Sequence, residues 1–130
     1  MTLAWCFQDG ATPFTESVLN FLAPDVTIRV PAIWPLEVAN ALLTAERRKR
    51  VTTAQVTTFL QVIKDLPISV DSTPVALAFD RILSLAREQN LTEYDASYLE
   101  LAIRESLIIA TLDERLRTAA PAVGVKLFAK

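Results

Sequence analysis

A dense apolar run, LIIATL at residues 107–112, limits the folds that this chain can adopt. A strand with one face in solvent alternates apolar and polar residues, whereas a strand covered on both faces is apolar along its length. Strands of the second kind belong mainly to parallel sheets with helices packed on both sides. We therefore expect residues 107–112 to form a buried strand of a parallel sheet in an α/β fold.

Strand-like and helix-like patterns alternate along the rest of the chain. Short runs rich in β-branched residues predict further strands at residues 27–32, 67–70 and 125–128. Apolar residues at helical spacing, with prolines at several starts, predict helices around those strands. The expected helices cover residues 1–7, 12–23, 35–50, 53–66, 74–90, 92–102 and 113–120. With no repeat, linker or low-complexity tract, we expect one domain over residues 1–130.

The composition removes several kinds of catalytic chemistry. The chain has 130 residues, of which none is histidine and only Cys6 is cysteine. Without histidine, serine–histidine and cysteine–histidine triads and the usual zinc sites are excluded. Two glycines are too few for a phosphate-binding glycine loop. The carboxylates that remain suit hard cations such as Mg²⁺ and Mn²⁺.

Charge and hydropathy indicate where such a chain resides. The formal net charge of −2 excludes a wholly basic surface, although it allows a local basic patch. No apolar run is long enough to cross a bilayer, and no signal segment is recognisable. We therefore expect a soluble, cytoplasmic protein with no membrane attachment.

Asp95 heads the apolar face of a predicted helix. In LTEYDASYLELA, at residues 91–102, Thr92 suits the N-cap position and Asp95 follows three residues later. The residues on the same helical face are Tyr98, Leu99, Ala102 and Ile103. A carboxylate at the top of a face that turns toward the core needs a compensating partner.

Glu37 has a similar position in the helix predicted at residues 35–50. Between residues 36 and 45 that helix is apolar except for Glu37, Asn40 and Thr44. These three lie at i, i+3 and i+7, which makes one narrow polar line along a helix that we expect to be buried. A solvated face would be broader and more charged, so the line indicates a polar cavity.

Asp113 directly follows the strand predicted at residues 107–112, and Glu37 follows the strand predicted at residues 27–32. In a parallel sheet the chain leaves the carboxyl ends of the strands at the ligand-binding edge. Taken singly, each acid is more simply explained as a helix-capping residue or as a solvent-exposed carboxylate than as a ligand. Taken together, Glu37, Asp95 and Asp113 are buried like charges that a divalent cation would compensate.

Three motifs, WPLEVANALLTAERRKR, LTEYDASYLELA and ATLDERLRTAA, occur in this order along the chain. In sequence and separation they resemble PIN-domain proteins, and most closely the VapC ribonuclease toxins of prokaryotic toxin–antitoxin pairs. The resemblance covers essentially the whole chain. It implies a three-layer α/β/α sandwich with a central parallel sheet. It also implies an acid cluster that binds Mg²⁺ or Mn²⁺ and cleaves RNA.

By position, Glu37, Asp95 and Asp113 match three acids of that cluster, which makes them the expected catalytic residues and metal ligands. Asn40 matches a polar residue one helical turn after the glutamate, and Thr111 matches a hydroxyl two residues before the last acid. We expect both to support the ligands by hydrogen bonds rather than to bind metal. The expected partners are an RNA substrate, a VapB-type antitoxin and a second copy of the chain in a homodimer.

The chain departs from the family pattern at its start. Members of the family begin with a short strand that ends in an aspartate, followed by a helix resembling LAWCF at residues 3–7. That strand and its acid have no counterpart here, and Asp9 lies too far along to replace the acid. Two explanations stay open. The natural protein begins upstream of Met1, or the chain is a short form with a weakened or inactive site.

A basic run, Arg47, Arg48, Lys49 and Arg50, ends the helix predicted at residues 35–50. Such a run could contact RNA phosphates. A solvated helix end that complements the helix dipole explains it better. We keep the run as a secondary RNA-binding candidate.

Two other functions remain open beside a metal-dependent endoribonuclease toxin. A catalytically silent PIN-like module that binds antitoxin or RNA fits the missing first acid. A phosphoryl-accepting receiver domain also has an acidic pocket on an α/β sheet, but it needs a lysine after a late strand. Lys126 lies at the start of the last predicted strand, so the receiver reading is the weakest of the three.

Overall fold

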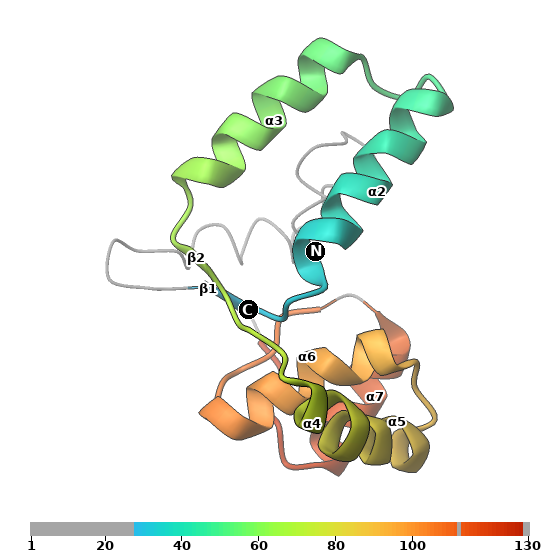
Figure 1. Cartoon of the computed structure of the whole chain (residues 1–130), viewed down its shortest axis with the longest axis vertical. Helices are drawn as coiled ribbons and strands as arrows, with labels where there is room; N and C mark the ends of the chain where they lie inside the picture. The colour runs from blue at the N-terminus through green and yellow to red at the C-terminus, as the bar shows by residue number, and fades with distance from the viewer. Residues whose placement is uncertain (1–27, 112, 129–130) are drawn as a thin grey trace. The chain divides into compact units, whose positions relative to one another are not determined.

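The computed structural model describes residues 28–111 and 113–128 (Figure 1). Contacts divide these residues into two compact units, residues 28–70 and residues 71–128. The two helices expected before this region lie outside the described residues, and the expectation of one domain stays a prediction. No helix in the described ranges is long and apolar enough to cross a membrane.

Two parallel strands lie in the unit of residues 28–70. They are β1 (Ile28–Val30) and β2 (Ile68–Val70). Their register pairs Ile28 with Ile68. Both strands are found where the β-branched runs predict them, so this part of the expected parallel sheet is confirmed.

Two helices connect β1 to β2, because parallel neighbours need a crossover. They are α2 (Trp34–Arg47) and α3 (Thr53–Asp65). Pro35 lies in the first turn of α2, where a missing N–H costs nothing. α3 begins with a capping box: the side chains of Thr52 and Gln55 each accept the other's backbone N–H, at 3.1 and 2.9 Å.

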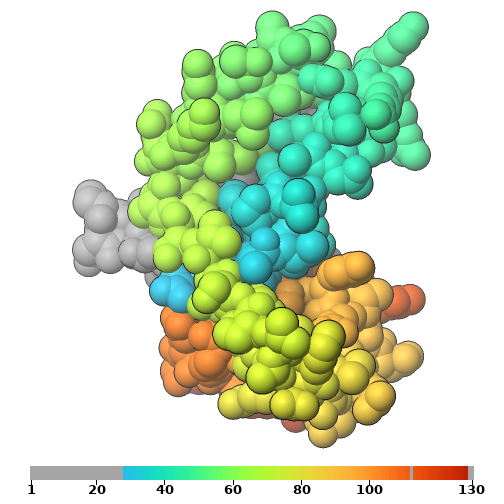
Figure 2. All heavy atoms as spheres, viewed as in Figure 1, coloured from blue at the N-terminus to red at the C-terminus, as the bar shows by residue number. Residues whose placement is uncertain are grey.

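α2 and α3 pack against each other through one apolar stripe on each helix. The residues of this cluster are Trp34, Val38, Leu42, Val56, Phe59 and Ile63. The side chains of the two helices meet in the space-filling view (Figure 2). Another side of α2 is open, because Leu36 and Leu43 are 69% and 41% exposed. The expectation that this helix is buried apart from one narrow polar line is therefore wrong, since the single stripe against α3 does not cover every apolar position.

The unit of residues 71–128 is mainly helical (Figure 1). Its first helical segment runs through α4 (Val75–Leu77), a wider π-helical turn η3 (Ala78–Ile82) and α5 (Leu83–Gln89). It continues with α6 (Glu93–Glu105) and α7 (Glu114–Ala122). The core residues are Ile82, Leu85, Ala86, Ala96, Leu99, Ala102, Ile109, Leu116, Ala119, Ala120 and Val125. These helices occupy the regions in which helical spacing predicts them.

The π-helical turn accommodates a five-residue step in the apolar pattern. Leu77 and Ile82 both pack into the core, although they are five residues apart. In a regular α-helix Arg81, four residues after Leu77, would lie on the same face as Leu77 and would point into the core. The extra residue in the wider turn lets Ile82 face inward and leaves Arg81 and Phe79 exposed.

Residues 107–111 and 125–128 meet through one parallel bridge, between Ile109 and Leu127. The N–H and the carbonyl of Ile109 both bond to the second segment, at 3.0 and 2.8 Å. The expectation of a strand covered on both faces is wrong for the described residues, since Ile108 is 57% exposed. With a single bridge the segment has too few ladder bonds to become a regular strand.

Candidate active site

Asp95 lies in the first turn of α6. Thr92 is the N-cap of this helix, and its hydroxyl accepts the N–H of Asp95 at 3.1 Å. Behind Asp95 the helix turns a face inward on which Leu99 and Ala102 are buried. The prediction that Asp95 heads a buried apolar face is confirmed.

Asp113 is the N-cap of α7, and it is exposed rather than buried as expected, because it precedes the first turn of the helix. Hydrogen bonds hold it on both sides. Its Oδ1 accepts the N–H of Leu116 at 3.1 Å, and its own N–H donates to Oγ1 of Thr111 at 3.0 Å. Arg117 Nη1 donates to the carbonyl of Thr111 at 3.0 Å, which ties this loop to α7. Thr111 therefore fixes the backbone at Asp113.

Asp95 and Asp113 lie close enough for the charge of one to act on the other. The pKa of Asp95 is raised above its ordinary value, first by partial burial and then by the negative charge of Asp113. A hydrogen bond with Thr92 and the positive charge of Arg115 lower this pKa by smaller amounts. A divalent cation would relieve the repulsion and accept hard oxygen ligands. The donor set of this acid pair therefore fits Mg²⁺ or Mn²⁺.

Glu37 lies in the first turn of α2, in the unit of residues 28–70, whereas Asp95 and Asp113 belong to the other unit. Glu37 is half-buried, and Asn40, one turn later, is exposed rather than enclosed in a polar cavity. Among the described residues no three carboxylate, histidine or cysteine side chains form a metal-binding group. The convergence of Glu37 on the Asp95–Asp113 pair stays a prediction.

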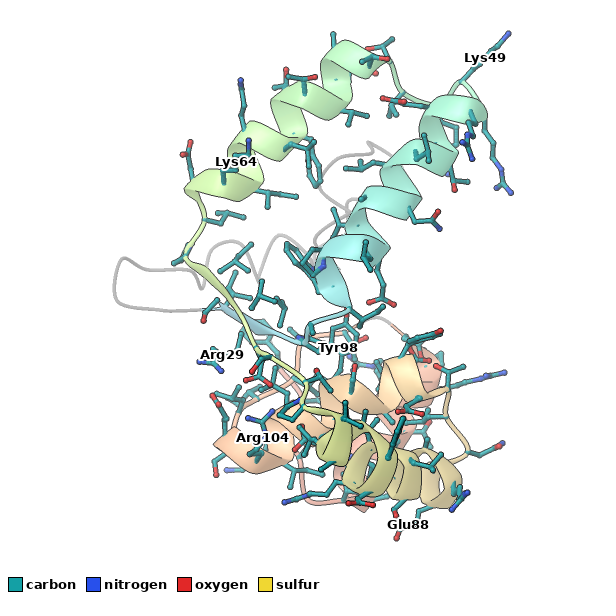
Figure 3. The ribbon with its side chains drawn as sticks, viewed as in Figure 1. Arg29, Lys49, Lys64, Glu88, Tyr98 and Arg104 are labelled. Carbon is teal, nitrogen blue, oxygen red and sulfur yellow. The ribbon has the colours of Figure 1, made fainter. Side chains whose placement is uncertain are left out.

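The basic run ends α2 in a solvated turn. Arg47, Arg48, Lys49 and Arg50 are exposed, and Lys49 points away from the helix (Figure 3). Lys49 has a φ of 59°, and the N–H of Arg50 donates to the carbonyl of Ala45 at 2.9 Å. This is the hydrogen bond that closes many helix ends. Contact of the run with RNA stays a prediction.

Arg115 is a residue of this site that the sequence reasoning missed. It lies two positions after Asp113, in the first turn of α7, and its charge acts on Asp95. No signal in the sequence indicated this role, because residues two positions apart on a helix do not face each other and Arg115 acts on an acid of another helix. The Asp95–Arg115 proximity itself depends on how α6 and α7 pack.

Parallel pairing, crossover helices and paired acids at two helix starts define an α/β protein of the class that includes metal-dependent nucleases. The chain belongs to the PIN-domain family, whose model matches residues 4–121. PIN domains are generally metal-dependent nucleases. The expected PIN-like α/β fold is confirmed.

A solved structure resembles this chain over much of its length. The crystal structure of PAE2754 from Pyrobaculum aerophilum matches it with a TM-score of 0.60 and 30% sequence identity. The match covers 70% of this chain and 60% of that one, so the chain spans less than two thirds of that protein. No curated protein shows a significant match.

Proposed function

We propose that this chain is a Mg²⁺- or Mn²⁺-dependent endoribonuclease and the toxin of a VapBC-type toxin–antitoxin pair. Membership of the PIN-domain family supports the nuclease class. The observation that carries the proposal is the closeness of Asp95 and Asp113 at the starts of α6 and α7, where a cation would relieve the repulsion between the two carboxylates. The three motifs that resemble VapC toxins support the finer assignment.

The proposed metal ligands are Asp95 and Asp113, with Glu37 as a third carboxylate from α2. Thr111 positions Asp113 through its backbone N–H. Asn40 is proposed to support Glu37 from the next turn of α2. When bound, Mg²⁺ or Mn²⁺ would lower the pKa of a water molecule and stabilise negative charge on the phosphate.

Hydrolysis of an RNA phosphodiester forms a bond from a water oxygen to phosphorus and breaks the bond from phosphorus to the leaving oxygen. The attacking water loses a proton, and the leaving oxygen gains one. In a chain without histidine, carboxylates are the side chains suited to accept that proton. Asp95 is proposed to hold the metal or to orient the water molecules around it, and the lowered pKa of a metal-bound water would replace the missing histidine base.

The proposed partners follow from the same resemblance. RNA is the substrate, and the exposed run from Arg47 to Arg50 is proposed to contact its phosphates. A VapB-type antitoxin would hold the toxin inactive, and the toxin itself is proposed to be a homodimer. We place the pair in the cytoplasm, where its RNA substrates are found.

Cleavage of RNA by the full chain tests the nuclease proposal. Wild-type protein should cleave RNA with Mg²⁺ or Mn²⁺ and stop when EDTA is added. Asp95→Asn should lower the rate about a hundredfold or more. Glu93→Gln is the matched control, because it removes an exposed acid from the same turn of α6 and should leave the rate unchanged. Cleavage that survives both EDTA and Asp95→Asn would overturn the proposal.

Growth of a bacterial host that expresses the chain tests the toxin role separately. Wild-type protein should arrest growth, and Asp95→Asn should not. Equal growth of both strains, with cleavage intact in the purified protein, would overturn the toxin role alone. Wild-type protein that binds RNA without cleaving it would favour the catalytically silent module.

A further inference from the structure

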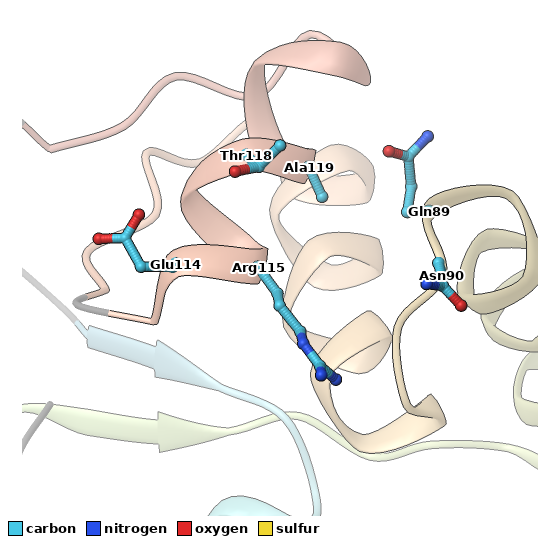
Figure 4. A pocket seen from close by; sticks show the side chains of 6 residues that line it. All are labelled: Gln89, Asn90, Glu114, Arg115, Thr118 and Ala119. Carbon is cyan, nitrogen blue, oxygen red and sulfur yellow. The ribbon is translucent and has the colours of Figure 1, made fainter.

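An open pocket of about 310 Å³ lies between the end of α5 and the first turns of α7 (Figure 4). The residues that line it are Gln89, Asn90, Glu114, Arg115, Thr118 and Ala119. All of them belong to the unit of residues 71–128. Ligand pockets in proteins span about 300–1,000 Å³, so this one suits a single small group.

The surface of the pocket is more apolar than polar, and a few polar groups project into it. Gln89 and Asn90 present amide groups from the end of α5, across the pocket from α7 (Figure 4). Thr118 adds a hydroxyl, and the buried Ala119 is short enough to leave room beside it. Amide and hydroxyl groups both donate and accept hydrogen bonds, as recognition of a polar ligand requires.

Arg115 gives the pocket a positive charge beside the acid pair. Its charge acts on Asp95, so the pocket adjoins the site formed by Asp95 and Asp113. Glu114 is the one acid in the lining, and its carboxylate points away from the guanidinium of Arg115 (Figure 4). Among the lining residues Arg115 is the cation to which an anion in the pocket would be drawn.

We infer that this pocket holds one nucleotide of an RNA strand next to the acid pair, with Arg115 on a backbone phosphate and Asn90 and Gln89 on the sugar or base. The planar guanidinium of arginine matches the oxygens of a phosphate. Amide side chains suit the 2′-hydroxyl and the edges of an unpaired base. This inference rests on the proposed ribonuclease function. In it, the pocket is the part of the site that positions the RNA strand.

Binding of a short, fluorescently labelled single-stranded RNA by the full chain tests this inference. EDTA is present throughout, so that the RNA stays intact and binding is measured apart from cleavage. Arg115→Gln should raise Kd roughly fivefold, the effect of one exposed charge contact. Between about 50 and 200 mM salt, it should also flatten the slope of log affinity against log salt by about 0.7, the value for one phosphate contact.

Asn90→Gly tests the amide wall without damaging the helix end. Asn90 ends α5 in the left-handed conformation, with φ 54° and ψ 48°, which glycine adopts freely and alanine does not. The substitution therefore removes the amide and keeps the backbone. It should raise Kd about threefold, the effect of one neutral hydrogen bond, and leave the salt slope unchanged.

Arg87→Gln is the matched control for charge. Arg87 is exposed on α5 and does not line the pocket, and its loss changes the net charge as much as the loss of Arg115 does. It should leave both Kd and the salt slope close to the wild-type values. If Arg115→Gln behaves like Arg87→Gln while wild-type protein still cleaves RNA, the pocket inference fails and the proposed function stands. If wild-type protein neither binds nor cleaves RNA, both fail.

Discussion

Arg104 donates two hydrogen bonds to the buried carboxylate of Glu100, from Nε to Oε2 at 2.9 Å and from Nη2 to Oε1 at 3.0 Å. Glu100 is only 3% exposed, and it lies one turn before Arg104 on α6. Arg104 Nη2 also lies 2.6 Å from Oδ2 of Asp71, which directly follows β2. Hydrogen bonds to Glu100 first, and to Asp71 second, raise the pKa of Arg104 above its ordinary value. One guanidinium thus joins residue 71 to α6.

Arg104→Met should lower the free energy of unfolding by about 2–3 kcal/mol, because it leaves the carboxylate of Glu100 buried without its cation. Chemical denaturation measures this change. The double variant Glu100→Met with Arg104→Met should recover much of the loss, since removing both partners leaves no unpaired buried charge. A double variant that loses more than Arg104→Met alone would contradict this account.

Asp95 should oppose folding when it is ionised. Burial and then Asp113 raise its pKa, so the folded state favours the protonated carboxyl. This penalty is absent below the ordinary value of 3.8 and grows as pH rises toward the folded-state pKa. In EDTA at about pH 7, Asp95→Asn should therefore be more stable than wild type, by less than about 1 kcal/mol because water screens the group.

Thermal melts at about pH 7 and about pH 3 check this dependence, because the advantage of Asp95→Asn should disappear at the lower pH. Mn²⁺ should reverse the order at neutral pH by stabilising the wild-type protein alone. A variant that is less stable than wild type in EDTA at neutral pH would show that Asp95 assists folding there.

Asp113 has a capping role and a proposed ligand role, which two substitutions separate. Asp113→Asn keeps an oxygen that accepts the N–H of Leu116, so it should change stability little. Asp113→Ala removes that acceptor and should cost about 1 kcal/mol. Both remove the carboxylate, so in thermal melts neither should gain the stability that Mn²⁺ gives to wild type. Glu114→Gln is the control, and Asp113→Asn with a wild-type response to Mn²⁺ would exclude Asp113 as a ligand.

Lys49→Gly should stabilise the unit of residues 28–70 by about 0.5–1 kcal/mol. Lys49 has a φ of 59°, a left-handed conformation that strains residues with a side chain and suits glycine. Gln61→Gly, at an exposed position inside α3, should instead destabilise by about 1 kcal/mol. Denaturation of both variants checks the contrast, and equal destabilisation would show that the turn at Lys49 carries no strain.

The sequence by itself determined the starts of the helices. Thr52 with Gln55, and Thr92 with Asp95, interact across three residues, and Pro35 acts within its own turn. Such contacts depend on nearest neighbours along the chain, so they can be recognised before any fold is known. The same local patterns indicated the buried face of α6.

The tertiary structure decided which strands pair and which residues of the segment from α4 to α5 face the core. The apolar run at residues 107–112 predicts a fully covered strand, but in the described part of this run only one bridge is formed, by Ile109 with Leu127. Strand pairing depends on a partner that is distant in sequence, so the run alone could not predict it. A π-helical turn accommodates the five-residue step from Leu77 to Ile82, so that both side chains pack on the core.

Tertiary packing likewise decided which charges meet. Arg104 and Asp71 are 33 residues apart, and Arg115 comes near Asp95 only because α6 and α7 share a core. Spacing showed that Asp95 and Asp113 each begin a helix, but not that each acts on the charge of the other. Charges act through space, and the distances between these groups follow from the burial of Leu99, Leu116 and Ala120, which fixes α6 against α7.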